Sequence, residues 1–333
     1  MEIRRSRGIT KLWVMGVTLA LLVSACGSGA GETPDVTKDG AVGAKDANKV
    51  KVVTTIAQIA EPLSVIGGER LEVRALMGPG VDPHLYKATQ SDIRRLEEAD
   101  VIFYSGLHLE ANMLKAFEEM GKRKPVVAVA EAVPEEKLLR HEGGAVDPHV
   151  WFDIDLWKEA LDAAVEQLRT FLENEADGKG AAEELEANKI AYFAEMDALK
   201  REALDKMSRI PRERRVLVTA HDAFGYFGRM LDIRVVGLQG LSTEDEIGLT
   251  DIEDTIAILE EYRVPAVFVE SSINPDKINA VLEGARERGL QVRLGGELFS
   301  DAMGEAGTDE GTYLGMFRHN VDTIYNALSG EEK

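Results

Sequence analysis

The segment AAEELEANKIAYFAEMDALKREALDKMSR, residues 181–209, contains no glycine or proline and is dominated by Ala, Glu, Lys, Leu and Met. Because these residues favour helices and Pro211 lies just beyond the run, the sequence predicts one long helix over residues 179–210. At a rise of 1.5 Å per residue, such a helix is roughly 40 Å long, enough to run the length of a domain. We expect it to link an N-terminal lobe, residues 50–178, to a C-terminal lobe, residues 211–333. Composition alone leaves open the alternative that it is one helix of a single larger domain.

Short β-rich runs alternate with helical runs on both sides of this helix, which is the pattern of parallel sheets covered by helices. The expected strands are residues 51–57, 71–77, 100–106, 125–130, 214–220, 234–240, 264–270 and 290–298. The expected helices include residues 91–99, 109–121, 250–263, 274–289 and 311–328. A chain of 333 residues is also about right for two domains of ordinary size. The sequence therefore predicts an α/β fold with two (β/α) lobes, parallel sheets and a long rigid helix between them.

The first 25 residues have the organisation of a signal peptide. Four basic residues precede the apolar run LWVMGVTLALLV, residues 12–23, which is too short and wrongly flanked for a membrane-spanning helix. The run leads into Cys26, the only cysteine, and LVSAC at residues 22–26 resembles the lipobox of bacterial lipoproteins, whose cysteine is acylated. We therefore expect a signal peptide at residues 1–25 and lipidation at Cys26. Residues 26–49 lack a periodic apolar pattern, which predicts a flexible tether that holds the protein at the extracytoplasmic surface of the cell membrane.

The chain is strongly acidic, with a formal net charge of −20 at pH 7. Removal of the signal peptide takes away four basic residues and one acidic residue, which changes this charge to −23. An acidic protein repels nucleic acids and anionic lipids, so we expect neither as a direct partner. Contact with the membrane is expected through the lipid anchor only.

Two copies of one short motif, VDPHLY at residues 81–86 and VDPHVW at residues 146–151, each carry a histidine. Proline fixes its own φ angle and pushes the preceding residue toward an extended conformation. His84 and His149 are therefore expected on stiff turns, which suit side chains that must keep one direction. His84 lies in the loop after the expected strand 71–77, and His149 follows the fourth expected strand of the N-terminal lobe.

Two further candidate ligands follow expected strands of the C-terminal lobe. His221 comes directly after the strand 214–220, and Asp301 comes three residues after the strand 290–298. Ligands of open parallel sheets bind beyond the carboxyl ends of the strands, so these residues should meet the two VDPH histidines where the lobes face each other. Three imidazoles and one carboxylate suit a borderline divalent metal such as Zn²⁺, whereas Ca²⁺ and Mg²⁺ prefer oxygen ligands alone. The predicted metal ligands are His84, His149, His221 and Asp301.

The other three histidines are weaker candidates. His141 lies in the loop LLRHEGG and His319 within the last expected helix, so both are expected at solvated or helix-packing positions. His108 is a stronger competitor because it also follows an expected strand. The alternatives for His108 are a fifth nitrogen near the site and a hydrogen-bond donor to one of the ligands.

An aspartate lies one or two residues from each candidate histidine, at Asp82, Asp147 and Asp222. A histidine that ligates a metal usually donates its other ring N–H to a carboxylate or a carbonyl, so these aspartates are candidates for orienting the ligands. An aspartate before a proline also simply favours a turn, which leaves both interpretations open for Asp82 and Asp147.

Four longer motifs resemble a known family. TAHDAFGYF (219–227), GLQGLSTEDE (237–246), FVESSINP (268–275) and GGELFSDAMGEAGTDEGTY (295–313) are similar to motifs of the cluster A-I solute-binding proteins of bacterial ABC transporters, the TroA-type zinc- and manganese-binding lipoproteins. The resemblance runs from about residue 51 to residue 328. It implies two (β/α) lobes joined by a rigid backbone helix, with one metal ion in the cleft between them. It also implies delivery of the metal to a membrane permease driven by an ATPase, and we expect the protein to be a monomer.

The ligand positions of this family match the four residues predicted above. At the third position, members devoted to manganese or iron often carry Glu, whereas this chain has His221. Dedicated zinc members often carry a long loop rich in His and acidic residues, whereas the segment between Pro134 and Asp147 is short and has only His141. These two features point in different directions, so the resemblance leaves open whether zinc, manganese or iron is the physiological metal.

A binding protein fits the residues better than an enzyme. Catalytic zinc usually has three protein ligands and an open position for water, whereas four protein ligands close the shell. The chain contains no H-E-x-x-H helix, G-x-S-x-G elbow, Walker A loop or G-x-G-x-x-G fingerprint. The expected function is therefore high-affinity capture of a divalent metal, with Zn²⁺ first because the ligand set suits it and Mn²⁺ next. The alternatives are a zinc-dependent hydrolase and, as a second role, a surface adhesin.

Overall fold

Strands and helices alternate through the residues that the computed structural model describes, which are 49–141, 143–174 and 178–330. These residues fall within one compact unit. The expected signal peptide, Cys26 and all of the expected tether except Lys49 lie outside the described residues. Within the described ranges, no helix is both long enough and apolar enough to cross a membrane.

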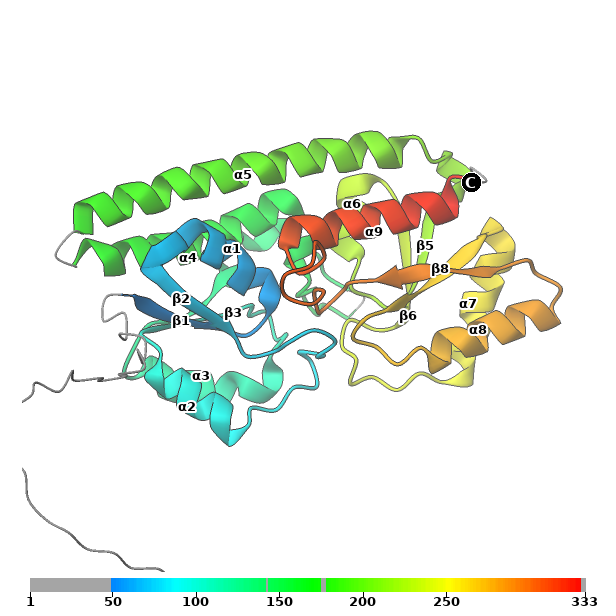
Figure 1. Cartoon of the computed structure of the whole chain (residues 1–333). Coiled ribbons are helices and arrows are strands. Elements are labelled where there is room, and N and C mark those ends of the chain that lie inside the picture. Colours follow the sequence, from blue (N-terminus) through cyan, green and yellow to red (C-terminus); the bar gives the residue numbers. More distant parts are fainter. Residues whose placement is uncertain (1–48, 142, 175–177, 331–333) are drawn as a thin grey trace, which may run out of the picture. The chain divides into compact units, whose positions relative to one another are not determined.

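A four-stranded parallel sheet forms the base of the N-terminal lobe. Its elements are β1 (Val50–Thr54), α1 (Ala57–Gly67), β2 (Leu71–Ala75), α2 (Gln90–Glu98), β3 (Val101–Tyr104), α3 (Leu114–Gly121) and β4 (Val126–Ala128). The strand order is β2-β1-β3-β4. The central strands β1 and β3 are apolar and mostly buried, as a parallel sheet covered on both faces requires. Helix α1 covers one side of the sheet, and α2 and α3 cover the other (Figure 1).

Two pairs of parallel strands form the C-terminal lobe. Its elements are β5 (Val216–His221), α6 (Gly225–Leu231), β6 (Arg234–Gln239), α7 (Leu249–Tyr262), β7 (Ala266–Glu270), α8 (Asp276–Glu287), β8 (Arg293–Leu298) and α9 (Tyr313–Leu328). β5 pairs with β6 and β7 pairs with β8, and β5 also lies beside β7, so β5 and β7 are the inner strands. β5 is buried throughout, which places its last residue, His221, inside the molecule. The predicted fold class, α/β with parallel sheets in two lobes, is confirmed.

Two long helices, α4 (Ile154–Glu173) and α5 (Gly178–Ser208), lie side by side. Buried residues of α5 recur at intervals of three and four, which places them on one face of the helix. These residues are Leu185, Lys189, Tyr192, Met196, Leu199, Ala203 and Met207. α5 contacts α1 and α4 in the first lobe and α6 and α9 in the second, as expected for a helix that spans both (Figure 1). It ends at Ser208 because the next two residues form tighter 3-10-type hydrogen bonds before Pro211.

The expected helix 109–121 begins later than predicted, because a tight turn over residues 107–110 includes its first two residues. Gly106, Leu107 and His108 all have positive φ angles, which a right-handed helix excludes. The buried carboxylate of Glu110 holds this turn by accepting two of its backbone N–H groups at 2.8 and 3.1 Å. A short 3-10 helix, η2 (Ala111–Met113), and then α3 follow the turn.

One continuous hydrophobic core joins the two lobes. Phe152, just before α4, stacks on Phe224 with ring centroids 4.6 Å apart. Phe227 of α6 contacts Phe152 and Phe317 of α9, with centroid distances of 6.1 and 5.5 Å. A second, smaller core fills the C-terminal lobe between its strands and the helices α7 and α8. Movement between the lobes has to disturb a packed aromatic contact, so we expect that movement to be small.

Candidate metal centre

His84 lies in the loop between β2 and α2 and is 5% exposed. Asp82 Oδ1 accepts the backbone N–H of His84 at 2.9 Å, which closes the turn of the first VDPH motif. The other oxygen, Oδ2, accepts the hydroxyl of Thr243, in the loop after β6, at 2.5 Å. The carbonyl of His84 accepts an N–H from Asn112 at 2.9 Å. The backbone of His84 is therefore held by its own lobe and, through Asp82, by the other lobe.

The second VDPH motif forms the same turn and adds a contact to the ring. Asp147 Oδ1 accepts the backbone N–H of His149 at 2.9 Å and lies 2.8 Å from His149 Nδ1. Because a carboxylate only accepts hydrogen bonds, Nδ1 carries the proton and the lone pair of Nε2 faces the centre of the site. Asp147 thus both closes the turn and orients the ring, whereas Asp82 reaches its histidine through the backbone.

His221 ends strand β5, and its orienting partner is Glu270, which ends the neighbouring strand β7. Glu270 Oε1 accepts the backbone N–H of His221 at 2.9 Å, and Oε2 lies 2.6 Å from Nδ1. Nδ1 carries the proton here too, so Nε2 faces the site. The expectation that Asp222 orients this histidine is wrong, because successive side chains of an extended chain point to opposite sides. The carboxylate of Asp222 lies 3.5 Å from Nε2 of His141 instead.

Asp301 lies in the loop after β8, and side chains of the N-terminal lobe hold it there. Gln58 of α1 donates from Nε2 to the carbonyls of Ser300 and Asp301 at 3.3 and 3.0 Å. Trp151 donates its indole N–H to the carbonyl of Ser300 at 3.2 Å. All four residues are buried. Asp301 therefore belongs to the C-terminal lobe by sequence, while its backbone is fastened to the N-terminal lobe.

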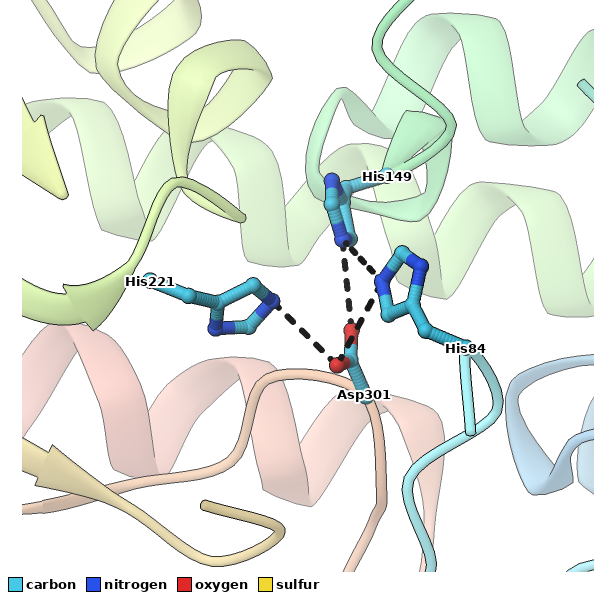
Figure 2. Close-up of side chains that lie close together, drawn as sticks. All are labelled: His84, His149, His221 and Asp301. Carbon is cyan, nitrogen blue, oxygen red and sulfur yellow. Dashed lines mark hydrogen bonds and ion pairs between the residues drawn. The ribbon is translucent and has the colours of Figure 1, made fainter. Parts of the chain in front are cut away.

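The side chains of the four predicted ligands converge on one point (Figure 2). One ligand atom from each residue lies within 4.8 Å of all the others. His84 Nε2 is 3.3 Å from His149 Nε2. The Asp301 carboxylate is 3.3 Å from His149 Nε2, 3.2 Å from His221 Nε2 and 3.8 Å from His84 Nε2. Two ligands of a tetrahedral metal with bonds of about 2.0–2.1 Å are roughly 3.3 Å apart, so this spacing fits a small tetrahedral ion.

Among the described residues, three of the atoms that face this point are buried without a hydrogen-bond partner. They are His221 Nε2 and both carboxylate oxygens of Asp301. Buried acceptors of this kind cost free energy unless something positive occupies the space between them. In their neutral forms, His149 and His221 carry the proton on Nδ1, and the lone pair of each Nε2 faces the Asp301 carboxylate. The arrangement therefore favours positive charge at the centre, supplied by a metal ion or by protonation of the imidazoles.

The raised pKa values of His149 and His221 also show that the site favours positive charge. Burial alone would lower the pKa of His149, but the hydrogen bond to Asp147 and the nearby charges of Asp147 and Asp301 raise it to about 9. Burial also opposes a charged His221, yet the charges of Glu270 and Asp301 raise its pKa well above the ordinary value. Burial would raise the pKa of Asp301, but the charge of His221 and the close approach of the His149 and His221 rings hold it well below the ordinary value.

His84 differs from the other two histidines. Burial lowers the pKa of His84 to about 4, and the charge of Asp301 offsets this effect only in part. Its imidazole is therefore neutral near pH 7 and can bind a metal without losing a proton. The site combines two histidines that favour a positive charge with one that is already in the ligand form.

The remaining histidines lie outside this group of converging ligand atoms. His108 is exposed and belongs to the turn with positive φ angles. His141 is exposed. His319, in α9, donates from Nε2 to the carbonyl of Glu297 at 3.0 Å, which is a helix-packing position. The structure therefore brings together the four predicted ligands without these three.

Sequence reasoning missed five residues that support the proposed ligands, which are Glu270, Gln58, Trp151, Asn112 and Thr243. Glu270 ends a buried strand beside the strand of His221, so a signal for it was present in the motif FVESSINP. Gln58 and Trp151 gave no comparable signal, because their role depends on which loop of the other lobe packs against them.

Known proteins resemble this chain over nearly all of its described length. A family model described as ZnuA, zinc-uptake complex component A, periplasmic, matches residues 52–327. The manganese-binding lipoprotein MntA of Bacillus subtilis is 48% identical over 281 residues, which cover 84% of this chain and 90% of MntA. The zinc-binding protein TroA of Treponema pallidum is 45% identical over 292 residues, which cover 87% of this chain and 93% of TroA. The solved structure of periplasmic TroA has a TM-score of 0.81, at 45% identity, over 84% of this chain and 99% of TroA.

Proposed function

The chain belongs to the ZnuA/TroA family of metal-binding substrate-binding proteins of ABC transporters, and we propose that it captures a divalent transition metal and delivers it to a membrane permease driven by an ATPase. The family predicted from the sequence is confirmed. The observation that carries the proposal is the convergence of three imidazole nitrogens on a buried carboxylate that has no hydrogen-bond partner among the described residues. The ligands that we propose are His84, His149, His221 and Asp301.

The family consists of solute-binding proteins of transporters and not of enzymes. The geometry of this chain supports the same class. The four proposed ligands are each at most 5% exposed and offer four ligand atoms, as many as a closed tetrahedral shell needs, whereas catalytic zinc keeps a position open for water. A closed shell holds an ion without activating a water molecule, which suits capture and delivery.

Zinc is the metal that we propose first. Three neutral imidazoles and one carboxylate suit tetrahedral Zn²⁺, and at a fixed N/O site the affinity for Zn²⁺ exceeds that for Mn²⁺. The separations of 3.2–3.8 Å between ligand atoms are close to those around a small tetrahedral ion. Manganese is the second candidate, because Asp301 can offer both oxygens and because the relative MntA is named a manganese-binding lipoprotein.

The proposed ligands come from both lobes. Two histidines extend from the N-terminal lobe, for which we propose residues 50–178, and His221 and Asp301 extend from the C-terminal lobe, for which we propose residues 211–333. The linking helix, predicted at residues 179–210, corresponds to α5 (Gly178–Ser208). A bound ion therefore holds the lobes together and completes a closed surface, and we propose that a monomer in this closed form docks on the permease. The continuous core beneath the site keeps the difference between open and closed forms small.

The proposed location is the extracytoplasmic surface of the cell membrane. Cys26 carries the lipid anchor after removal of residues 1–25, and the relative MntA is named a lipoprotein. Fractionation of cells that express Cys26→Ala tests the anchor, because this variant should leave the membrane fraction or remain unprocessed. A processed Cys26→Ala protein that stays in the membrane fraction would contradict the anchor.

Metal analysis of protein purified without added metal, followed by competition titrations at neutral pH, tests the function and the metal. We expect Zn²⁺ to bind and to displace Mn²⁺ at equal concentration. His221→Glu adds an oxygen ligand and should reduce the difference in affinity between Zn²⁺ and Mn²⁺. A wild-type protein that binds neither metal would refute the function. Mn²⁺ that holds its place against equimolar Zn²⁺ would refute only the choice of metal.

A further inference from the structure

The contact between Asp82 and Thr243 joins the two lobes directly beside the metal ligands. Asp82 Oδ1 closes the turn that carries His84, while Oδ2 accepts the hydroxyl of Thr243 from the loop after β6. One carboxylate therefore both positions a ligand histidine and bridges the lobes. Because its two oxygens belong to one planar group, a shift at Thr243 is passed on to the turn of His84.

The loop that carries Thr243 is anchored to the strand pair that carries His221. Gln239, the last residue of β6, is the direct partner of His221 in the β5–β6 register. Its side-chain amide donates to the carbonyl of Thr243 at 2.8 Å and also to the carbonyl two residues further on. A continuous path of contacts thus runs from His221 through Gln239, Thr243 and Asp82 to His84, from one ligand to another across the lobes.

A second contact reinforces the first. Asn112, in η2, donates to the carbonyl of His84 at 2.9 Å and to Glu244 Oε1 at 3.2 Å. It therefore ties the backbone of His84 to the residue that follows Thr243. We call the two contacts between the lobes, Asp82–Thr243 and Asn112–Glu244, the latch.

A cavity of about 440 Å³ lies beside the latch. Its walls include Asp82 and Thr243 of the latch, and also Leu85 and Ala220, each of which is the chain neighbour of a ligand histidine. The ligands themselves are buried. The Asp82–Thr243 contact of the latch therefore lies between this cavity and the metal site.

We propose that the latch positions His84 and keeps the lobes closed over a bound metal ion, so that Thr243 sets the rate at which the ion leaves. This inference rests on the proposed function, because it requires a metal ion at the four ligands. An ion that leaves toward the cavity has to part His84 from His221, and the path of contacts between these residues resists that separation. The competing interpretation is that Thr243 only shapes its own loop.

The rate of metal release separates these interpretations. Protein loaded with Zn²⁺ is mixed with excess EDTA, and release is followed by tryptophan fluorescence, since Trp151 lies 5.3 Å from the ring of His149. Thr243→Val keeps the shape of the side chain and removes its hydroxyl, so release should become about tenfold faster, as the loss of a hydrogen bond to a charged group predicts. Thr243→Ser keeps the hydroxyl and should release Zn²⁺ at nearly the wild-type rate. Asn112→Ala removes the second contact and should also accelerate release.

The same loop offers a matched control. Ser242 accepts the backbone N–H of Glu244 at 3.2 Å, a contact within the loop, so Ser242→Ala should leave the release rate unchanged. Wild-type protein that fails to bind Zn²⁺ would refute the proposed function and the latch together. Wild-type protein that binds Zn²⁺ while Thr243→Val releases it no faster, or no faster than Ser242→Ala does, would overturn the latch alone.

Discussion

The two VDPH motifs share a sequence and a turn, yet they hold their histidines in different ways. In both, the aspartate accepts the backbone N–H of the histidine two residues later, at 2.9 Å. Asp147 uses the same oxygen for the ring of His149, so this ligand is aimed within its own lobe. Asp82 makes its second contact with Thr243 of the other lobe, so the position of His84 depends on how the lobes meet. A repeated motif thus sets where a histidine is mounted, and its surroundings decide how firmly the ring is aimed.

The second VDPH motif is also more deeply buried than the first. His149 is fully buried, and the close approach of Asp147 is allowed by Gly225, where a Cβ atom would lie only 2.7 Å from Asp147 Oδ2. Next to His84, by contrast, Leu85 is 51% exposed. We therefore expect the first VDPH motif to be the part of the site that moves when metal enters or leaves.

The largest effect is expected from removing either histidine. His84→Ala and His149→Ala each remove a proposed ligand and should weaken Zn²⁺ binding by more than about a hundredfold. Loss of a residue that only hydrogen-bonds to a ligand typically lowers metal affinity by about 10–100-fold. Metal should stabilise the wild type by about 4 kcal/mol at a thousandfold excess over Kd, and both variants should lose most of this gain in thermal unfolding. His221→Ala and Asp301→Ala should behave in the same way.

The other histidines supply the controls for these variants. His141→Ala and His319→Ala should leave binding unchanged, and His108→Ala should have at most an intermediate effect. A His108→Ala variant that loses binding while Asp301→Ala retains it would show that the ligand assignment is wrong.

The next largest effect separates the two aspartates. Asp147→Asn keeps an oxygen for the turn but weakens the hold on the ring of His149, so Zn²⁺ affinity should fall by about 10–100-fold. Asp82→Asn keeps the turn of His84 and does not touch the ring, and its amide N–H can still donate to the hydroxyl of Thr243, so affinity should fall only a few-fold. Isothermal titration with a competing chelator measures both. Equal losses in the two variants would show that the motifs hold their histidines alike.

The two histidines should also differ in their response to pH. The pKa of His149 is raised to about 9, so in the metal-free protein this imidazole is protonated near pH 7 and has to release its proton when a metal binds. The pKa of His84 is lowered to about 4, so this residue is already neutral there and releases none. Metal affinity should therefore rise as the pH increases from about 6 toward 9, by up to about tenfold per unit for each histidine that is deprotonated.

Calorimetry in buffers with different ionisation enthalpies counts the protons released by zinc binding. Asp147→Asn removes a charge that favours protonated His149, so this variant should release fewer protons near pH 7 than the wild type. Asp82→Asn should release the same number as the wild type. Zinc binding with no proton release near pH 7 would contradict the raised pKa of His149.

The convergence of the four proposed ligands could be predicted from the sequence because each is marked by its place along the chain. Two carry a motif that stiffens the backbone before the histidine, and two follow a strand of the C-terminal lobe. Strand ends of a parallel sheet gather at one edge, so the convergence of these residues follows from the order of the elements. The long helix could be predicted as well, because a run without glycine or proline depends little on tertiary contacts.

The supporting contacts could be predicted only in part. Asp147 was a candidate because it lies two residues from its ligand, but the same argument wrongly selected Asp222 in place of Glu270. Successive side chains of a strand point to opposite faces, whereas side chains at the ends of adjacent strands lie side by side. The partner of His221 is therefore Glu270 of β7. The contact of Thr243 with Asp82 depends on how two loops of different lobes meet, and no local pattern encodes it.

The smallest effect concerns the prolines that the two motifs share. Pro83→Ala and Pro148→Ala should each lower the stability of the metal-free protein by about 0.4–1 kcal/mol, mainly because the unfolded chain gains conformational freedom. Metal affinity should change little in either variant, since the hydrogen bond from the backbone N–H of each histidine to its aspartate still closes the turn. The first motif is more exposed, and its aspartate contacts the backbone of His84 but not the ring. Any loss of metal affinity should therefore be greater in Pro83→Ala than in Pro148→Ala. Urea unfolding measures the stability of both variants, and zinc titration measures their metal affinity. A loss of affinity as large as that in Asp147→Asn would show that the proline, rather than the aspartate, holds the histidine in place.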